Sequence, residues 1–161
     1  LARRFHHARV TLLDRASALS PARRRTKETA VHERVEVLAA DMFDADLGGP
    51  YDVVVASHVF PHFNAKTCEK LLRRLGKVTS PGGRLIVHDY VPDETRTANA
   101  PAALFAALML AWTREGNTYT YSEYTKLFTK CGFLAPVMHA PPHFTTQFLV
   151  GERKSRRARL G

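Results

Sequence analysis

Side chains that could hold a ligand follow two short apolar segments of the chain. Residues 35–40 and 52–56 have the length and the β-branched content of buried strands. The side chains that follow these segments are Asp41, Met42, Ser57, His58 and His62. In an open parallel sheet, ligands bind outside the carboxyl ends of the strands. We therefore expect these five residues to share one edge of a sheet, which is the candidate site.

Carboxylates in this part of the chain suggest a nucleotide-type ligand. Residues 9–13 form a third β-rich segment, which ends at Asp14. A carboxylate at a strand end can accept both hydroxyls of a ribose. Asp41 can accept from an adenine amino group, and the flexible thioether of Met42 can lie on the ring. The alternatives are a solvated loop acid or helix cap for Asp14 and ordinary core packing for Met42.

A further strand end adds groups that could exchange protons. The turn expected at residues 81–83 precedes a strand at residues 84–87, which ends at His88, Asp89 and Tyr90. A histidine can accept a proton at neutral pH. A metal is the alternative, with ligands drawn from His58, His62, His88 and Asp89. Their spacing is not diagnostic and adjacent strand ends explain their clustering, so we predict no metal.

Hydrophobic periodicity predicts the elements that position these residues. Helices are expected at residues 21–31, 65–78, 101–112 and 121–130, and two final strands at residues 134–138 and 144–150. Ser20 and Pro21 indicate a helix start with proline in its first turn, followed by a basic, solvated outer face. The helix at residues 101–112 is apolar nearly all round, which predicts that it is enclosed on several sides. The two final strands should pair as an antiparallel hairpin at the sheet edge.

Composition is consistent with one α/β domain in a reducing compartment. The 161 residues can bury one sizeable core. Of the net charge of +9, the last nine residues carry five, which leaves +4 for the rest. Cys68 and Cys131 form no metal or disulfide pattern, which predicts a cytoplasmic location. The longest apolar stretch, about residues 98–112, is shorter than the ~20 residues that span a bilayer, so we expect no membrane association.

The motifs DVVVASHV and SPGGRLIVHDYVPDE, with the helix between them, resemble class I S-adenosylmethionine-dependent methyltransferases of the small-molecule O-methyltransferase type. The resemblance covers residues 8–151. It implies a Rossmann-like, mostly parallel sheet with helices on both faces and a C-terminal antiparallel hairpin. It also implies a first strand and a glycine-rich loop before Leu1, and no GxGxG occurs in the 161 residues. We expect a partial methyltransferase catalytic domain at residues 1–152 and a basic tail at residues 153–161.

The resemblance assigns roles to individual residues. S-adenosylmethionine is the implied cofactor, and the residues implied to bind it are Asp14, Asp41, Met42 and Ser57. The residues implied to face the methyl acceptor are His58, Phe105, Met109 and Trp112. Simple core packing is the alternative for the three residues of the apolar helix.

The catalytic positions of the resembled enzymes are only partly kept. Their histidine base falls seven residues before Cys68, where this chain has Pro61, followed by His62. A further family acid falls at Thr118. Asp89 matches the acid that orients the base. We therefore predict that His62, rather than His58, accepts the proton and lies near Asp89.

The implied reaction is methyl transfer to a hydroxyl of a small aromatic or polyketide-like metabolite. The alternative is a catalytically silent binding module or an RNA-associated protein, although few aromatic residues interleave with the basic ones, so a nucleic-acid partner is not expected. We expect the 161 residues alone to be inactive. The full-length protein could form a homodimer.

Overall fold

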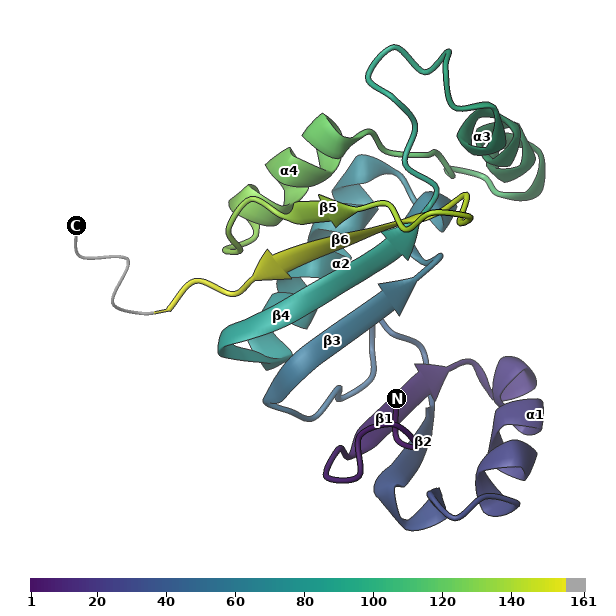
Figure 1. Ribbon diagram of the computed structural model, residues 1–161, viewed down its shortest axis with the longest axis vertical. Coiled ribbons are helices and arrows are strands. Elements are labelled where there is room, and N and C mark those ends of the chain that lie inside the picture. The colour runs from purple at the N-terminus through teal and green to yellow at the C-terminus, as the bar shows by residue number, and fades with distance from the viewer. Residues whose placement is uncertain (156–161) are drawn as a thin grey trace. The chain divides into compact units, whose positions relative to one another are not determined.

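The computed structural model describes residues 1–155 (Figure 1). The chain divides into two compact units, an N-terminal unit, Leu1–Leu47, and a C-terminal unit, Gly48–Gly161. Each unit contains its own parallel strand pair. Most of the predicted basic tail, residues 156–161, lies outside the described residues.

The N-terminal unit is a β-α-β arrangement. Its elements are β1 (Val10–Asp14), α1 (Ala16–Lys27), a short 3-10 helix η1 (His32–Arg34) and β2 (Val35–Ala39). The two strands are parallel and in register from Val10 opposite Val35 to Asp14 opposite Ala39. The strands predicted at residues 9–13 and 35–40 are therefore confirmed.

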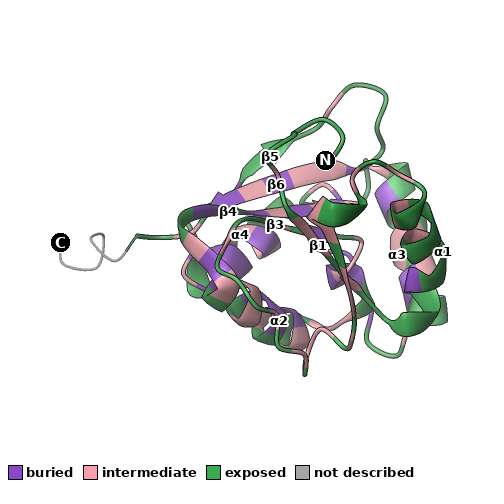
Figure 2. Cartoon of the chain, turned by 90° about the horizontal axis from the view of Figure 1, so that it is seen from below, coloured by how far each residue is buried: buried purple, intermediate pink, exposed green. Residues whose placement is uncertain are grey.

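Helix α1 begins earlier than predicted. We placed its start at Pro21, but the helix starts at Ala16 and includes Pro21 as its sixth residue. Proline is tolerated best in the first turn, where the backbone N–H has no partner, so we took it as the start signal. The predicted solvated face is confirmed, because the helix buries only Leu19 and exposes its basic residues (Figure 2).

The C-terminal unit contains a four-stranded sheet in the order β3-β4-β6-β5. The strands are β3 (Tyr51–Ser57), β4 (Thr79–Asp89), β5 (Val137–His139) and β6 (Gln147–Glu152). β3 and β4 are parallel, whereas β6 is antiparallel to both β4 and β5. The predicted α/β fold with a C-terminal antiparallel hairpin at the sheet edge is confirmed.

Strand β4 is longer than predicted because it includes the glycine-rich segment that we took for a turn. The pairing of β3 with β4 is irregular between Tyr51 and Val53. At Gly83, an added Cβ would lie 2.9 Å from the carbonyl oxygen of Ser80 and 3.0 Å from that of Asp52. Glycine is therefore required here for close backbone approach.

Helices α2 (Ala65–Val78) and α4 (Tyr121–Lys130) cover one face of this sheet and have the predicted bounds (Figure 1). Asn64 caps α2 by accepting from the backbone N–H of Thr67 at 2.9 Å. Thr120 and Glu123 form a capping box at the start of α4. The side chains that the two helices bury include Cys68, Leu71, Leu72, Tyr124, Leu127 and Phe128.

Arg153, the first residue of the predicted basic tail, is tied to the folded unit. Its Nη1 atom donates to the carbonyl oxygens of Cys131 and Gly132, at 3.1 and 3.0 Å. The guanidinium also lies over the ring of Phe133, 5.5 Å from the centroid. Arg153 is therefore part of the packing around the end of α4.

Helix α3 (Ala100–Trp112) has the predicted position but not the predicted enclosure. It buries Ala102 and Met109. The exposed apolar side chains are Leu104, Leu110 and Trp112, with exposed fractions of 75%, 72% and 75%. The prediction that α3 is enclosed on several sides is thus wrong within the described residues. No helix in residues 1–155 is long and apolar enough to cross a membrane.

The exposure of Trp112, the single tryptophan of the chain, is directly measurable. We expect its fluorescence to resemble that of solvated indole and to be quenched by acrylamide almost as efficiently as N-acetyltryptophanamide. Stern–Volmer quenching of the purified chain measures this accessibility. Blue-shifted emission with weak quenching would show that α3 is covered.

Candidate functional site

The polar residues of the C-terminal unit gather where β3 and β4 end. The parallel register places Ser57 opposite His88, so that His58 and Asp89 follow directly on neighbouring strands. The backbone N–H of His58 donates to the carbonyl oxygen of His88 at 2.9 Å. Adjacent strand ends therefore bring two histidines and one acid together, as predicted from the sequence.

His58 is the histidine beside Asp89. Its Nδ1 atom lies 3.7 Å from Asp89 Oδ1, an ion-pair distance when the imidazole is protonated. His58 has a φ of 53°, a left-handed conformation that is uncommon for a residue with a side chain. The neighbouring Asp89 carboxylate raises the pKa of His58, and partial burial opposes this shift. Its side chain remains 38% exposed.

Asp89 is a fully buried acid with three neighbouring partners. Its Oδ2 atom accepts from the hydroxyl of Tyr124 at 3.0 Å, and its Oδ1 atom accepts from the backbone N–H of Tyr90 at 2.9 Å. Burial raises the pKa of Asp89, although His58, Tyr124 and the Tyr90 N–H act against that shift. Unpaired burial of a carboxylate is costly, so Tyr124 is needed to hold this group.

Two aromatic rings lie beside the ring of His58. Tyr90 and Phe105 are stacked, with centroids 4.3 Å apart and planes at 27°. The centroid of the His58 ring lies 5.7 Å from that of Tyr90 and 6.1 Å from that of Phe105. The stacked pair thus presents an apolar surface beside an imidazole, which suits a flat aromatic ligand.

His88 is held between side chains rather than available for proton transfer. Its Nδ1 atom lies 3.0 Å from Ser57 Oγ, and its Nε2 atom lies 2.8 Å from Thr146 Oγ1. Its ring stacks on Phe148 at 4.3 Å. Burial lowers the pKa of His88, which favours the neutral form.

The role of His62 as the proton acceptor stays a prediction. It is an exposed residue at the end of the 3-10 helix η2 (Phe60–His62), and its ring lies 6.3 Å from the ring of Phe63. The structure places the ring of His58 beside Asp89, with Nδ1 3.7 Å from Oδ1. Pro61 is buried, and its carbonyl oxygen accepts from the backbone N–H of Asn117 at 3.0 Å.

The residues predicted on the apolar helix separate into three environments. Phe105 is half-buried and stacks on Tyr90, so it belongs to the aromatic surface beside His58. Met109 is buried, which agrees with the alternative of core packing. Trp112 is largely exposed, so it agrees neither with core packing nor with an enclosed position.

Thr118, where the resembled enzymes have an acid, contributes to loop packing instead. It is fully buried, and its carbonyl oxygen accepts from Arg96 Nη1 at 3.0 Å. Arg96 also pairs with Glu123 at 2.6 Å, which connects the loop after β4 to the start of α4. No sequence signal had indicated this role of Arg96.

The acids of the N-terminal unit lie at neighbouring strand ends. Asp14 ends β1 opposite Ala39, the last residue of β2, and Asp41 follows two residues later. Asp14 Oδ1 accepts from the backbone N–H of Arg15 at 2.7 Å, and the Arg15 side chain lies 3.8 Å from Asp41 Oδ2. Both acids are exposed, and Met42 is half-buried.

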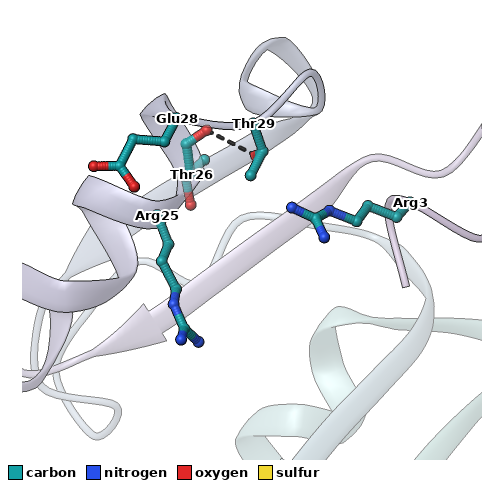
Figure 3. Close-up of a pocket in the computed structure, with 5 residues that line it drawn as sticks. All are labelled: Arg3, Arg25, Thr26, Glu28 and Thr29. Carbon is teal, nitrogen blue, oxygen red and sulfur yellow. Dashed lines mark hydrogen bonds between the residues drawn. The ribbon is translucent and has the colours of Figure 1, made fainter.

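An open pocket of about 650 Å³ in the N-terminal unit contains none of these acids. It is lined by Arg3, Arg25, Thr26, Glu28 and Thr29. Figure 3 shows Arg3 extending toward the end of α1, where the hydroxyl of Thr29 donates to the carbonyl oxygen of Thr26 at 3.0 Å. The lining of this pocket is polar and open, which does not favour an aromatic ligand. In the described part of the chain, no group of three or more His, Cys, Asp or Glu residues could hold a metal ion.

The fold and the positions of the polar side chains indicate a class of protein. Polar side chains at the carboxyl ends of parallel strands are typical of α/β proteins that bind small ligands there. Residues 1–134 match the family model of the O-methyltransferase domain, so the chain belongs to this family.

Comparison with known proteins agrees with this family. TcmO, the tetracenomycin polyketide synthesis 8-O-methyl transferase of Streptomyces glaucescens, is 27% identical over 83% of this chain and 39% of its own length. A candidate O-methyltransferase of Nostoc punctiforme is 32% identical with a TM-score of 0.90, covering 94% of this chain and 47% of that one. The S-adenosylmethionine-dependent methyltransferase SibL is 30% identical with a TM-score of 0.83, covering 96% and 46%. The chain thus spans less than half the length of these relatives.

Proposed function

We propose that the whole protein transfers a methyl group from S-adenosylmethionine to a hydroxyl of a small aromatic or polyketide-like metabolite. The observation that carries this proposal is the pair of acids, Asp14 and Asp41, at the ends of two adjacent parallel strands in a chain of the O-methyltransferase family. The name of TcmO, which describes a polyketide O-methyl transfer, supports the acceptor class.

The residues present fit this cofactor. An ionised carboxylate has about four acceptor sites. Asp14 therefore retains capacity for two ribose hydroxyls after accepting from the Arg15 N–H. Asp41 would accept from the adenine amino group, with Met42 against the ring. When bound, S-adenosylmethionine supplies an activated methyl group on a sulfonium.

The acceptor would rest on the aromatic surface of the C-terminal unit. The stacked rings of Tyr90 and Phe105 offer an apolar face to a flat ring, and His58 lies beside them. Positioning of the acceptor oxygen in line with the methyl group can supply a large part of the barrier reduction.

Methyl transfer is tested with the whole protein, S-adenosylmethionine labelled in its methyl group, and a panel of phenolic polyketides. We expect the label in an O-methylated product, identified by mass spectrometry and fragmentation. Cofactor binding without product from any acceptor would favour the catalytically silent binding module. Binding of RNA without cofactor binding would favour the RNA-associated alternative.

Asp14→Ala should weaken cofactor binding by about 1–3 kcal/mol, because ribose hydroxyls would lose their acceptor. Isothermal titration calorimetry of the whole protein measures the change. Asp44→Ala is the matched control, since it removes an exposed acid of the same unit from the turn after Asp41. Equal affinities of the Asp14 variant and the wild type would contradict the assignment.

We further propose that the whole protein is a cytoplasmic homodimer and that its partner is a small-molecule acceptor. Two free, buried cysteines are consistent with a reducing compartment. Light scattering on the whole protein measures the oligomeric state.

A further inference from the structure

We propose that His58 is the catalytic residue that removes the proton of the acceptor hydroxyl, and that Asp89 is the residue that positions it. This inference rests on the proposed methyl transfer and names the proton acceptor of that same site. It departs from the sequence-based prediction, which placed His62 in this role.

The backbone of His58 directs its side chain toward Asp89. Residues other than glycine adopt a positive φ at an energetic cost and do so where the surrounding structure enforces it. Here the φ of 53° follows directly after β3, and the N–H of His58 is fixed by the carbonyl oxygen of His88. The strained residue is thus the one that turns an imidazole from the strand end toward the buried acid.

Asp89 can orient His58 because Asp89 is itself fixed. It is fully buried and bonded by the Tyr124 hydroxyl and the Tyr90 N–H. Since Nδ1 of His58 faces Asp89 Oδ1 at 3.7 Å, Nε2 is the nitrogen left for a ligand. A buried acid beside one ring nitrogen stabilises the imidazolium that forms when the other nitrogen accepts a proton, as in catalytic acid–histidine pairs.

The surroundings of His58 suit this role. The titratable groups that face it are Asp89, His88 and Tyr90, all from β4 or the residue after it, while Phe105 of α3 contributes only an apolar ring. His88 is engaged by Ser57 and Thr146, and its pKa is lowered. Within residues 1–155, His58 is therefore the imidazole at these strand ends that has a nitrogen without a hydrogen-bond partner and an aromatic surface beside it.

The step balances in atoms and charge. The bond between the methyl carbon and the sulfonium sulfur breaks, and its electron pair stays on sulfur, which becomes a neutral thioether. The methyl carbon bonds to the acceptor oxygen, and the hydroxyl proton moves to Nε2 of His58. The positive charge thus passes to an imidazolium that Asp89 stabilises.

His58→Asn is the decisive variant, because asparagine tolerates the left-handed conformation but cannot accept the proton. We expect its single-turnover rate, at saturating cofactor and acceptor, to fall by about 100- to 10,000-fold, with unchanged cofactor affinity. His143→Asn is the matched control, since His143 is an exposed histidine that also has a positive φ, of 71°. Its rate should equal that of the wild type.

The positioning role of Asp89 is tested by pH. A base acts when deprotonated, so kcat/KM should fall as the pH drops through the pKa of His58, which Asp89 raises. Asp89→Asn removes the carboxylate and should move this inflection to lower pH. The His58 imidazole titration, followed by NMR in the cofactor-free protein, should shift in the same direction. A purely structural Asp89 would leave both inflections in place.

The outcomes separate this inference from the proposed function. Transfer that survives His58→Asn with less than about a tenfold loss overturns the inference alone, as does a loss in His62→Asn that equals or exceeds it. Absence of transfer by the wild-type protein overturns both. A His58 titration that Asp89→Asn leaves unchanged overturns the positioning role whatever the activity.

Discussion

Replacing Phe60 with alanine is expected to lower the free energy of unfolding by about 3–5 kcal/mol. The Phe60 side chain is fully buried, and its ring meets that of Tyr124 edge-on, with centroids 6.1 Å apart and planes at 88°. Truncation removes the transfer free energy of the ring and leaves a cavity, because surrounding side chains relax only partly. The lost edge-to-face pair adds to this cost.

Urea-induced unfolding, followed by circular dichroism, measures this change. Phe144→Ala is the matched control, because the Phe144 side chain is 63% exposed and its truncation opens no cavity. We expect the control to stay within about 0.5 kcal/mol of the wild type. Similar losses for both variants would show that Phe60 is not part of a closely packed core.

The elements predicted most accurately are those with a strong local signal. Helices α2 and α4 have the predicted bounds because their apolar residues recur at helical spacing and polar caps mark their starts, at Asn64 and Thr120. The parallel pairing of β1 with β2 and of β3 with β4 followed from short β-branched segments separated by helices.

The features that were predicted wrongly depend on the tertiary surroundings of a helix. The exposure of α3 could not be predicted, since a helix that is apolar on every side carries no record of which side is covered. Pro21 was misread because the rule for proline describes helix starts in general, whereas α1 tolerates it in its sixth position.

In the candidate site, too, features with a local sequence signal were predictable, and features that depend on tertiary structure were not. The clustering of His58, His88 and Asp89 was predictable from strand ends. The position of the His58 ring beside Asp89 was not, because the sequence gives no sign of the positive φ that His58 adopts after β3. Tyr124, the partner of Asp89, lies 35 residues further along the chain and had no signal beyond a helical pattern.

Tyr124→Phe is expected to lower the free energy of unfolding by about 1.5–3 kcal/mol near neutral pH, the contribution of a hydrogen bond to a charged group. The substitution keeps the ring and removes only the hydroxyl that donates to Asp89 Oδ2 at 3.0 Å. Asp89 is fully buried, so no solvent replaces the lost donor.

The sign of the pH dependence follows from the pKa of Asp89. Burial raises this pKa above its ordinary value of 3.8, so the contribution of Asp89 to stability is greatest below that value and declines as the pH rises through the raised pKa. The Tyr124 hydroxyl lowers this pKa, and its removal therefore makes the decline larger. The difference between variant and wild type should grow with pH, since only the ionised carboxylate loses a charge-assisted hydrogen bond.

Tyr119→Phe provides the matched control in the same aromatic cluster. The ring of Tyr119 lies 5.7 Å from that of Tyr124, and its hydroxyl donates to the backbone carbonyl oxygen of Phe63 at 2.6 Å, a neutral acceptor. Its loss should cost about 0.5–1.5 kcal/mol at every pH, because the acceptor does not titrate. Chemical denaturation of the three proteins between acid and neutral pH compares the two losses. Parallel losses for both variants would mean that Asp89 is not ionised beside Tyr124, and the carboxylate could not then stabilise a protonated His58.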